Sequence, residues 1–211
     1  MKIFVVGSST NTFQQLNDIR EKFIINEYHE KANIDFLNPW YCELTGLYYL
    51  WQNCEDDIVG LEHYRRQFVN SNNELLSKAE ILELLKTSDI ICKYHKFMPP
   101  PGYKQNCYNW WLQHPHYKIL LDAFVSKLNQ SDKFIEYLDT ADHFAQCNMF
   151  ICKKELIDKY CQWLFTELAK INKHDFVSIP RIIGYIAEYI FSAWLHINNY
   201  KIHYQTVKEY K

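Results

Sequence analysis

Short apolar runs alternate with amphipathic segments along this chain, and that alternation constrains its fold more than any other feature. Residues 3–6 form a β-rich run that ends at Gly7, and residues 58–64 and 146–152 have the composition of two further strands. Segments with helical spacing of apolar residues lie between and after these runs. The pattern predicts an α/β sheet, whose ligand sites lie beyond the carboxyl ends of its strands.

Three further elements follow from spacing. Apolar residues at helical intervals predict a first helix over residues 13–28. Asn38 is a good N-cap and Pro39 fits the first helical position, so we expect one helix over residues 39–53. Residues 95–114 contain Pro-Pro-Pro-Gly and little periodicity, which is typical of a long loop that binds a ligand or acts as a lid.

Length and composition indicate a single domain spanning residues 1–211. The 23 basic and 25 acidic side chains give a net charge of −2, and no basic run exceeds two residues, which argues against nucleic acid as a partner.

The first apolar run is too short for a secretory signal, and no later run approaches a membrane span, so we expect a cytoplasmic protein. The seven cysteines form no CxxC pair and fit reduced thiols.

Aromatic side chains make up 17% of the chain. Flat apolar rings with polar tips suit sugar rings, which present C–H patches beside hydroxyl groups. An aromatic-rich core and surface without that role is an equally weighted alternative.

The end of the strand predicted over residues 58–64 concentrates charge. It runs into His63-Tyr64-Arg65-Arg66, so two guanidinium groups lie where an α/β fold binds ligands. Arginine forms paired hydrogen bonds with phosphate oxygens and stays charged at cellular pH. In the alternative interpretation, both arginines form surface ion pairs with nearby carboxylates: Asp56, Asp57 or Glu62.

Polar residues also interrupt apolar segments elsewhere. Glu43 lies beside the apolar face of its predicted helix, where it either pairs with an arginine of the His-Tyr-Arg-Arg turn or accepts a hydrogen bond from a sugar hydroxyl. Asn148 interrupts a buried strand, and its amide must bond to backbone or to a ligand. Asp142 and His143 precede that strand, and a lone histidine in such a place is more often structural than functional.

The last predicted helix carries a polar face. Arg181, Tyr185 and Glu188 recur at positions i, i+4 and i+7, opposite the apolar stripe. This face either is solvated or lines a cleft, and spacing alone favours a solvated face.

Four motifs in this order resemble a bacterial family: ELTGLYYLW, HYRR, CNMFICKKE with YCQWLF, and RIIGYIAE. These are capsule and O-antigen glycosyltransferases long catalogued as a domain of unknown function, whose characterised members include galactofuranosyltransferases. The resemblance is close over residues 38–70 and 142–195. The usual family start, a strand followed by His-Lys, is replaced here by Gly7-Ser8-Ser9.

The resemblance implies a single-domain variant of the nucleotide-sugar glycosyltransferase A-type (Rossmann-like) fold. It further implies transfer of a sugar, with galactofuranose as the candidate, from a UDP-sugar to a growing capsule or O-antigen type polysaccharide, with inversion at the sugar carbon. The acceptor would be a glycan or a lipid-linked glycan, reached through peripheral attachment at the inner face of the cell membrane or through a partner enzyme. A non-catalytic glycan-binding domain and a phosphoesterase that uses His63 are the alternatives.

Many such folds hold a divalent metal on the diphosphate with Asp-x-Asp after a central strand. Here the His-Tyr-Arg-Arg tetrad occupies that place, and the acidic run at residues 55–57 lies before the strand, at its wrong end. We therefore expect no metal cofactor and no metal-ligating residues. Arg65 or Arg66 would then neutralise the leaving diphosphate.

These inferences divide the expected site into three groups. The catalytic group holds the general base, Glu188 or His143, with Asp142 in reserve. The expected donor-binding residues are Gly7, Ser8, Glu43, His63, Tyr64, Arg65 and Arg66. The expected acceptor-binding residues are Asn148, Arg181 and Tyr185.

Overall fold

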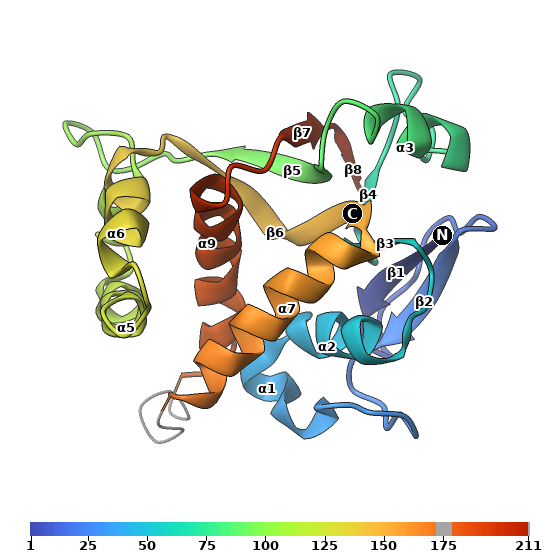
Figure 1. Ribbon diagram of the computed structural model, residues 1–211, viewed down its shortest axis with the longest axis horizontal. Coiled ribbons are helices and arrows are strands. Elements are labelled where there is room, and N and C mark those ends of the chain that lie inside the picture. Colours follow the sequence, from blue (N-terminus) through green and yellow to red (C-terminus); the bar gives the residue numbers. More distant parts are fainter. Residues whose placement is uncertain (172–178, 211) are drawn as a thin grey trace.

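The computed structural model describes residues 1–171 and 179–210, and within them eight strands form one sheet (Figure 1). The strands are β1 (Lys2–Gly7), β2 (Arg20–Ile24), β3 (Ile58–His63), β4 (Arg66–Phe68), β5 (Ile90–Lys96), β6 (His143–Lys153), β7 (Ile202–Gln205) and β8 (Val207–Glu209). The helices are η1 (Asp35–Leu37), α1 (Asn38–Tyr41), α2 (Leu44–Asn53), α3 (Lys78–Leu84), α4 (Cys107–Trp111), α5 (Pro115–Val125), α6 (Ser131–Thr140), α7 (Lys154–Ala169) and α9 (Ile182–Ile197).

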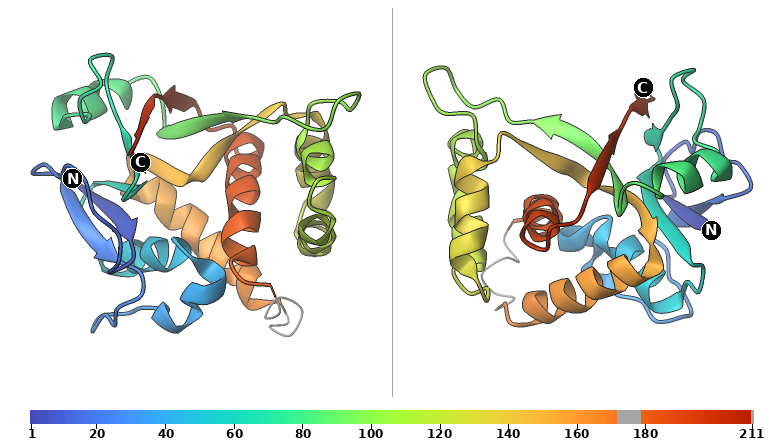
Figure 2. Two further views of the ribbon diagram at one scale, coloured as in Figure 1. Left: turned by 180° about the vertical axis from the view of Figure 1, so that it is seen from behind. Right: turned by 45° about the horizontal axis from the view of Figure 1, so that its top comes forward.

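The sheet is mixed, with the order β2-β1-β3-β6-β5-β7. β1 is parallel to both β2 and β3, so the carboxyl ends of these three strands meet at one edge. β6 lies antiparallel between β3 and β5, and β7 runs parallel to β5. Figure 2 shows the last two strands crossing from β5 toward β4, where β8 pairs antiparallel with β4 beside the β3–β4 turn. The predicted α/β sheet is therefore confirmed.

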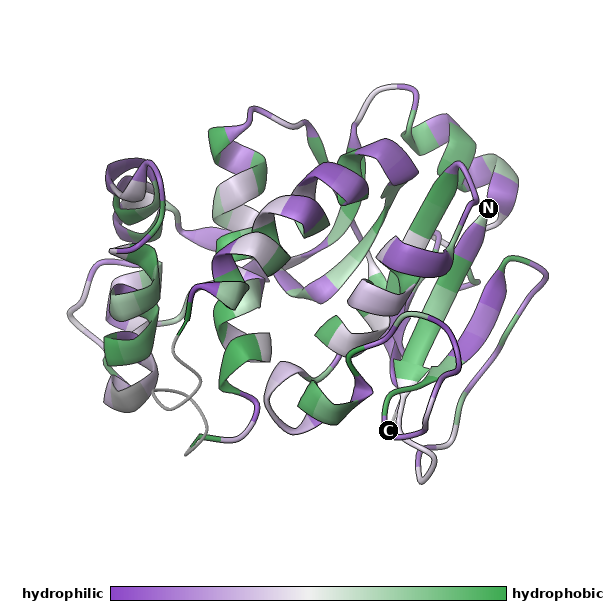
Figure 3. Cartoon of the chain, turned by 60° about the horizontal axis from the view of Figure 1, so that its bottom comes forward, coloured by the Kyte–Doolittle hydropathy of each residue, from purple (hydrophilic) through white to green (hydrophobic). Residues whose placement is uncertain are grey.

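Helices cover the two faces of this sheet unequally. α1, α2, α7 and α9 lie on one face, over the larger apolar cluster, while α3 lies on the other (Figures 1 and 2). Because side chains of a strand alternate between faces, Val59 and Leu61 of β3 belong to the larger cluster, and Ile3 of β1 belongs to the smaller one with Ile81 of α3. Figure 3 shows that hydrophilic residues gather on the outward sides of the helices. No helix in the described ranges is long and apolar enough to cross a membrane.

The predicted first helix is wrong. Residues 13–19 form no helix, and the strand β2 follows at Arg20–Ile24. The apolar residues that suggested helical spacing pack in different places: Phe13 lies against Tyr64, at 6.4 Å between ring centroids, and Phe23 stacks on Phe4 at 5.3 Å. Pairing with β1 therefore outweighs the local spacing in this segment.

The helix predicted over residues 39–53 is broken in two at Cys42, whose φ of 51° is left-handed. α9 passes directly beside the break: the Arg181 N–H donates to the Pro39 carbonyl at 2.9 Å, and Gly184 is so close that a Cβ there would lie 3.3 Å from Cys42 Cβ. Asn38 is the first residue of α1 and makes no cap, because Leu37 occupies the N-cap position. The break turns Glu43 away from the direction that one continuous helix would give it.

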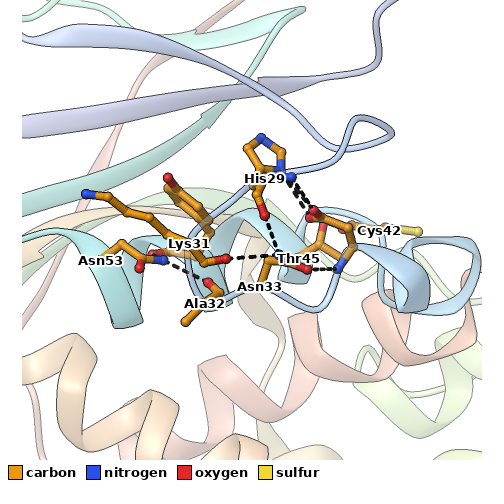
Figure 4. Close-up of polar contacts among 9 residues, drawn as sticks. His29, Lys31, Ala32, Asn33, Cys42, Thr45 and Asn53 are labelled. Atoms are coloured by element: carbon orange, nitrogen blue, oxygen red, sulfur yellow. Dashed lines mark hydrogen bonds and ion pairs between the residues drawn. The ribbon is translucent and has the colours of Figure 1, made fainter.

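Hydrogen bonds fix the segment between β2 and α1 against α2 (Figure 4). The His29 N–H donates to the Asp35 carboxylate at 2.9 Å, and the Asn53 amide donates to the Ala32 carbonyl at 2.8 Å. The Thr45 hydroxyl donates to the Cys42 carbonyl at 2.8 Å, across the break between α1 and α2. These bonds hold the approach to α1 in place.

The loop predicted over residues 95–114 is interrupted by α4. Asn106 caps this helix by accepting a hydrogen bond from the Asn109 N–H at 2.9 Å. The cap residue Asn106 lies between the Pro-Pro-Pro-Gly run and a group of aromatic residues, and the sequence alone did not identify it as the start of a helix. Its role as a binding loop or lid stays a prediction.

Candidate functional site

A cleft of about 390 Å³ opens at the sheet edge where β1 and β3 end. Its walls come from the ends of these two strands, the junction of α1 with α2, and the residue that precedes α9. This is the position at which α/β sheets bind ligands. Seven of the residues singled out from the sequence line it: Gly7, Ser8, Glu43, His63, Tyr64, Arg65 and Arg181.

The end of β1 forms a tight part of this wall. A Cβ at Gly7 would lie 2.9 Å from the Phe13 ring and 3.0 Å from Tyr64 Cβ, so only glycine allows both side chains to pack there. Ser8 then starts a turn in which its N–H and hydroxyl both donate to Asn11 Oδ1, at 2.6 and 2.9 Å. Asn11 also lines the cleft, although the sequence did not single it out.

β6 is interrupted beside the cleft. Cys92 of β5 pairs with Phe150 and Tyr94 pairs with Ala145, so four residues of β6 lie opposite a single residue of β5. Two consecutive residues of this bulge, Cys147 and Asn148, have left-handed φ values of 69° and 49°. Left-handed backbone is costly for residues other than glycine and persists only where surrounding contacts enforce it. β-bulges of this kind redirect side chains near active sites.

The bulge directs polar groups toward α2 and α9. The Asn148 amide donates to Glu43 Oε1 at 2.8 Å and to the Gly184 carbonyl at 3.2 Å, and the Cys147 N–H donates to Glu188 Oε2 at 3.0 Å. Asn148 and Glu43 are buried, and Glu188 is half-buried. The interpretation of this face as solvated is therefore wrong for Glu188, whereas Arg181, at the start of the same face, is exposed.

The two carboxyl groups influence each other. Burial raises the pKa of Glu188 to about 8, and the negative charge of Glu43 acts in the same direction. Burial lowers the pKa of His63, although the Glu43 carboxylate opposes that shift. Near neutral pH, Glu188 thus tends to hold a proton and His63 tends to be neutral. Perturbed neighbouring acids and bases of this kind are typical of functional sites.

Three buried polar atoms in this region have no hydrogen-bond partner within the described residues: Asn38 Oδ1, His63 Nε2 and Asn148 Oδ1. Buried polar atoms in proteins nearly always have a partner, so these three point to groups that a ligand or water would supply. Asn38 lines the cleft, and the sequence suggested it only as a helix cap. Asn148 bonds to both a backbone carbonyl and Glu43, whereas the pairing of Glu43 with an arginine does not occur within the described ranges.

The structure separates the two adjacent arginines. Arg65 is exposed, lines the cleft and lies over the Tyr64 ring at 5.9 Å. Arg66 instead pairs with Glu209 of β8 at 3.1 Å. In the described part of the chain neither arginine forms an ion pair with Asp56, Asp57 or Glu62. The surface-pair alternative therefore names the wrong partners.

The remaining predicted residues are Arg181, Tyr185, Asp142 and His143, and of these four Arg181 lines the cleft. Arg181 stands over the ring of Tyr185 at 5.4 Å. Asp142 and His143 pair with each other at 2.6 Å, and His143 stacks on Tyr94 at 5.2 Å. Asp142 and His143 do not line the cleft, and among the described residues no hydrogen bond or ion pair joins them to Glu43 or Glu188. Glu188 does not line the cleft either, but it interacts electrostatically with Glu43, which does.

Two of the charged side chains that line the cleft, Arg65 and Arg181, carry guanidinium groups that suit an anion. The carboxylate of Glu43 lines the cleft as well. Within residues 1–171 and 179–210, no group of three or more His, Cys, Asp or Glu side chains could hold a metal ion. The expectation that no metal is needed stays a prediction.

Comparison with known proteins agrees with this architecture. Residues 4–199 match the family described as "Domain of unknown function (DUF4422)". No curated protein matches the chain in sequence. A solved structure of WbbM, described as a bifunctional glycosyltransferase in its apo form, has a TM-score of 0.77 over 99% of this chain, with 22% identical residues. The chain spans 45% of the WbbM chain. The predicted Rossmann-like α/β fold of glycosyltransferases is thereby confirmed.

Proposed function

The chain belongs to the family described as Domain of unknown function (DUF4422), and we propose that it is a glycosyltransferase that moves a sugar from a nucleotide-sugar donor to a glycan. One observation carries this proposal. The cleft at the ends of β1 and β3 combines Arg65 and Arg181 with Glu43 and with the polar atoms of Asn38 and His63 that lack partners among the described residues. Glu188 is not part of the cleft lining, but its carboxyl group interacts electrostatically with that of Glu43. The description of WbbM as a bifunctional glycosyltransferase supports the same assignment.

The donor is proposed to be a UDP-sugar whose diphosphate lies between Arg65 and Arg181. Both guanidinium groups line the cleft, and paired hydrogen bonds from arginine match phosphate oxygens. The sequence placed Arg181 among the expected acceptor-binding residues, and we now assign it to the boundary between donor and acceptor. Galactofuranose as the sugar, and a capsule or O-antigen type polysaccharide as the product, follow from the family resemblance. A lipid-linked acceptor and peripheral attachment to the membrane belong to the same proposal.

The chemical step needs one base and one group that stabilises the leaving charge. The acceptor hydroxyl oxygen forms a bond to the sugar C1, while the bond from C1 to the diphosphate oxygen breaks and its electron pair leaves with UDP. The hydroxyl proton passes to the Glu43–Glu188 carboxyl pair, in its singly or doubly ionised form. A raised pKa such as that of Glu188 makes the pair a stronger base than an ordinary carboxylate.

Charge on the departing UDP is proposed to be neutralised by arginine rather than by a metal ion. Calorimetry with UDP in EDTA, followed by added manganese, tests this directly. Replacing Arg65 by Lys should weaken UDP binding by about 1.5–3 kcal/mol, the value of a hydrogen bond to a charged group. Arg66→Lys is the matched control, because Arg66 is paired with Glu209 and does not line the cleft.

UDP affinity that appears only with manganese would contradict the arginine proposal, as would a larger loss in Arg66→Lys than in Arg65→Lys. UDP release from a panel of UDP-sugars, UDP-galactofuranose included, then tests the transferase activity itself. We expect slow hydrolysis of the preferred donor even without acceptor. A protein that binds glycans but has no affinity for UDP would instead be the non-catalytic domain.

A further inference from the structure

A second hollow, of about 520 Å³, lies at the start of α5. Gln113, His114 and Tyr117 contribute to its lining. The Tyr117 ring lies 5.5 Å from the ring of Tyr185 on α9, and the Arg181 guanidinium lies 5.4 Å from the Tyr185 ring centroid. Since Arg181 also lines the donor cleft, a continuous series of contacts joins the cleft to the second hollow.

The rings in this series are both accessible and held in place. Tyr117 and Tyr185 are half-buried, and His114 is exposed, with its ring 5.8 Å from that of Tyr117. Trp111 packs against Tyr117 in an edge-to-face contact, with 5.2 Å between the ring centroids, and Trp111 itself is only 2% exposed. Such a support fixes the orientation of the tyrosine ring before any ligand binds, which lowers the entropy cost of binding.

We propose that Tyr185, Tyr117 and His114 form an aromatic track that binds the acceptor glycan, with its reacting end at the cleft and its preceding sugars in the second hollow. This inference rests on the proposed glycosyltransferase function and names the acceptor subsite of the same site. The occupant is an oligosaccharide of several sugar units.

The chemistry of the track favours a carbohydrate. Aromatic faces pack against the C–H patches of sugar rings, and the polar tips of Tyr and His bond to the hydroxyl groups beside them. Gln113 adds an exposed amide at the far end. The track also has the right direction, because Tyr185 and Glu188 are three residues apart on α9 and so lie on neighbouring turns, next to the proposed base.

A uracil ring could stack on the same tyrosines, so donor affinity serves as the second measurement. The probe is an array of purified capsule and O-antigen oligosaccharides of increasing length, with UDP calorimetry carried out on the same proteins. Wild-type protein should bind longer oligosaccharides more tightly than short ones. Tyr117→Ala should lose about tenfold in affinity for the longer oligosaccharides, while its UDP affinity stays within about twofold of wild type.

Two further variants keep the test interpretable if Tyr117→Ala loses packing against Trp111. Tyr117→Phe retains the ring and should retain most of the affinity. Gln113→Ala removes an exposed amide, whose hydrogen bond to the Met98 carbonyl at 3.3 Å lies on the surface and not in the core. The matched control is Tyr28→Ala, because Tyr28 is 80% exposed and lies in neither hollow.

The outcomes separate the two proposals. Wild-type protein that binds UDP but shows no preference for longer oligosaccharides overturns the track and leaves the transferase proposal standing. The same holds if glycan affinity is unchanged in both Tyr117→Ala and Gln113→Ala, or if Tyr117→Ala loses UDP affinity instead. Wild-type protein that neither binds UDP nor releases it from any UDP-sugar overturns the proposed function, and with it the track as an acceptor site.

Discussion

Glu62 and His63 are neighbours in β3, yet they face opposite sides of the sheet and their surroundings differ in kind. Glu62 accepts two hydrogen bonds from the Arg20 guanidinium, at 2.8 and 2.9 Å, and a third from the Phe68 N–H at 3.2 Å. Both side chains of this ion pair are fully buried. On the His63 face, by contrast, a ring nitrogen lacks a partner within the described residues, and two carboxyl groups influence each other.

On this one strand, the Glu62 face serves the stability of the fold and the His63 face belongs to the candidate functional site. A buried ion pair with its hydrogen bonds satisfied has no further binding capacity and holds the surrounding elements in one arrangement. A region with unpaired polar atoms and like charges lowers stability, and it offers those groups to a ligand. We therefore expect substitutions on the Glu62 face to affect folding, and substitutions on the His63 face to affect ligand binding and catalysis.

The largest expected effect is on the Glu62 face. Arg20→Met leaves the Glu62 carboxylate buried without its partner, which should lower the free energy of unfolding by about 3–5 kcal/mol. Urea denaturation measures this loss. Lys2→Met is the matched control, because the Lys2–Glu21 pair is exposed and worth less than about 1 kcal/mol. Equal losses in the two variants would mean that the buried Arg20–Glu62 pair matters no more to stability than an exposed pair.

On the opposite face, Glu188→Gln should act on catalysis. The amide oxygen can still accept the hydrogen bond from the Cys147 N–H, so the fold should be retained. Turnover should fall by about 10²-fold or more, while UDP affinity stays nearly unchanged. Rates of UDP release and calorimetry on the same variant provide both values. Unchanged turnover would remove Glu188 from the proposed carboxyl pair.

The same carboxyl group should give the fold a characteristic pH dependence. Its pKa rises from an ordinary value of 4.5 to about 8 in the folded protein, so the folded state binds the proton more tightly than the unfolded chain. The Glu188 contribution to stability is therefore fully present below about pH 4.5 and is lost as the pH rises toward 8. His63, with its lowered pKa, acts in the opposite sense below about pH 6.5.

The difference between wild type and Glu188→Gln isolates the first contribution, because His63 is present in both. Melting temperatures measured from pH 5 to pH 8 should fall more steeply for wild type than for the variant. Parallel curves would mean that Glu188 titrates alike in the folded and unfolded states.

The smallest expected effect concerns the surface pair beside the cleft. Glu209 is exposed and pairs with both Arg66 and Lys93, so Glu209→Gln should lower the free energy of unfolding by less than about 1 kcal/mol. UDP affinity should stay unchanged, since Arg66 does not line the cleft. A clear loss of UDP affinity in calorimetry would return Arg66 to the donor site and weaken the separation of the two arginines.

Several elements could be predicted because their signals are local. The apolar runs at residues 58–64 and 146–152 correspond to β3 and β6, and the last predicted helix, which carries Tyr185 and Glu188, corresponds to α9. The first predicted helix failed because the spacing of its apolar residues came from contacts with separate parts of the fold. The cleft itself was predicted in outline, since a polar tetrad at the end of a strand must lie at the ligand-binding edge of an α/β sheet.

The sequence alone therefore determined where β3, β6 and α9 lie and that Arg65 stands at the end of β3. Both follow from the spacing of apolar and polar side chains along short stretches of the chain. Only the tertiary structure decided that Asn148 bonds to Glu43, 105 positions away, and that Arg66 pairs with Glu209, 143 positions away. These contacts depend on strand order, on the break at Cys42 and on the bulge of β6. Packing between distant elements produces these features, and no local pattern specifies them.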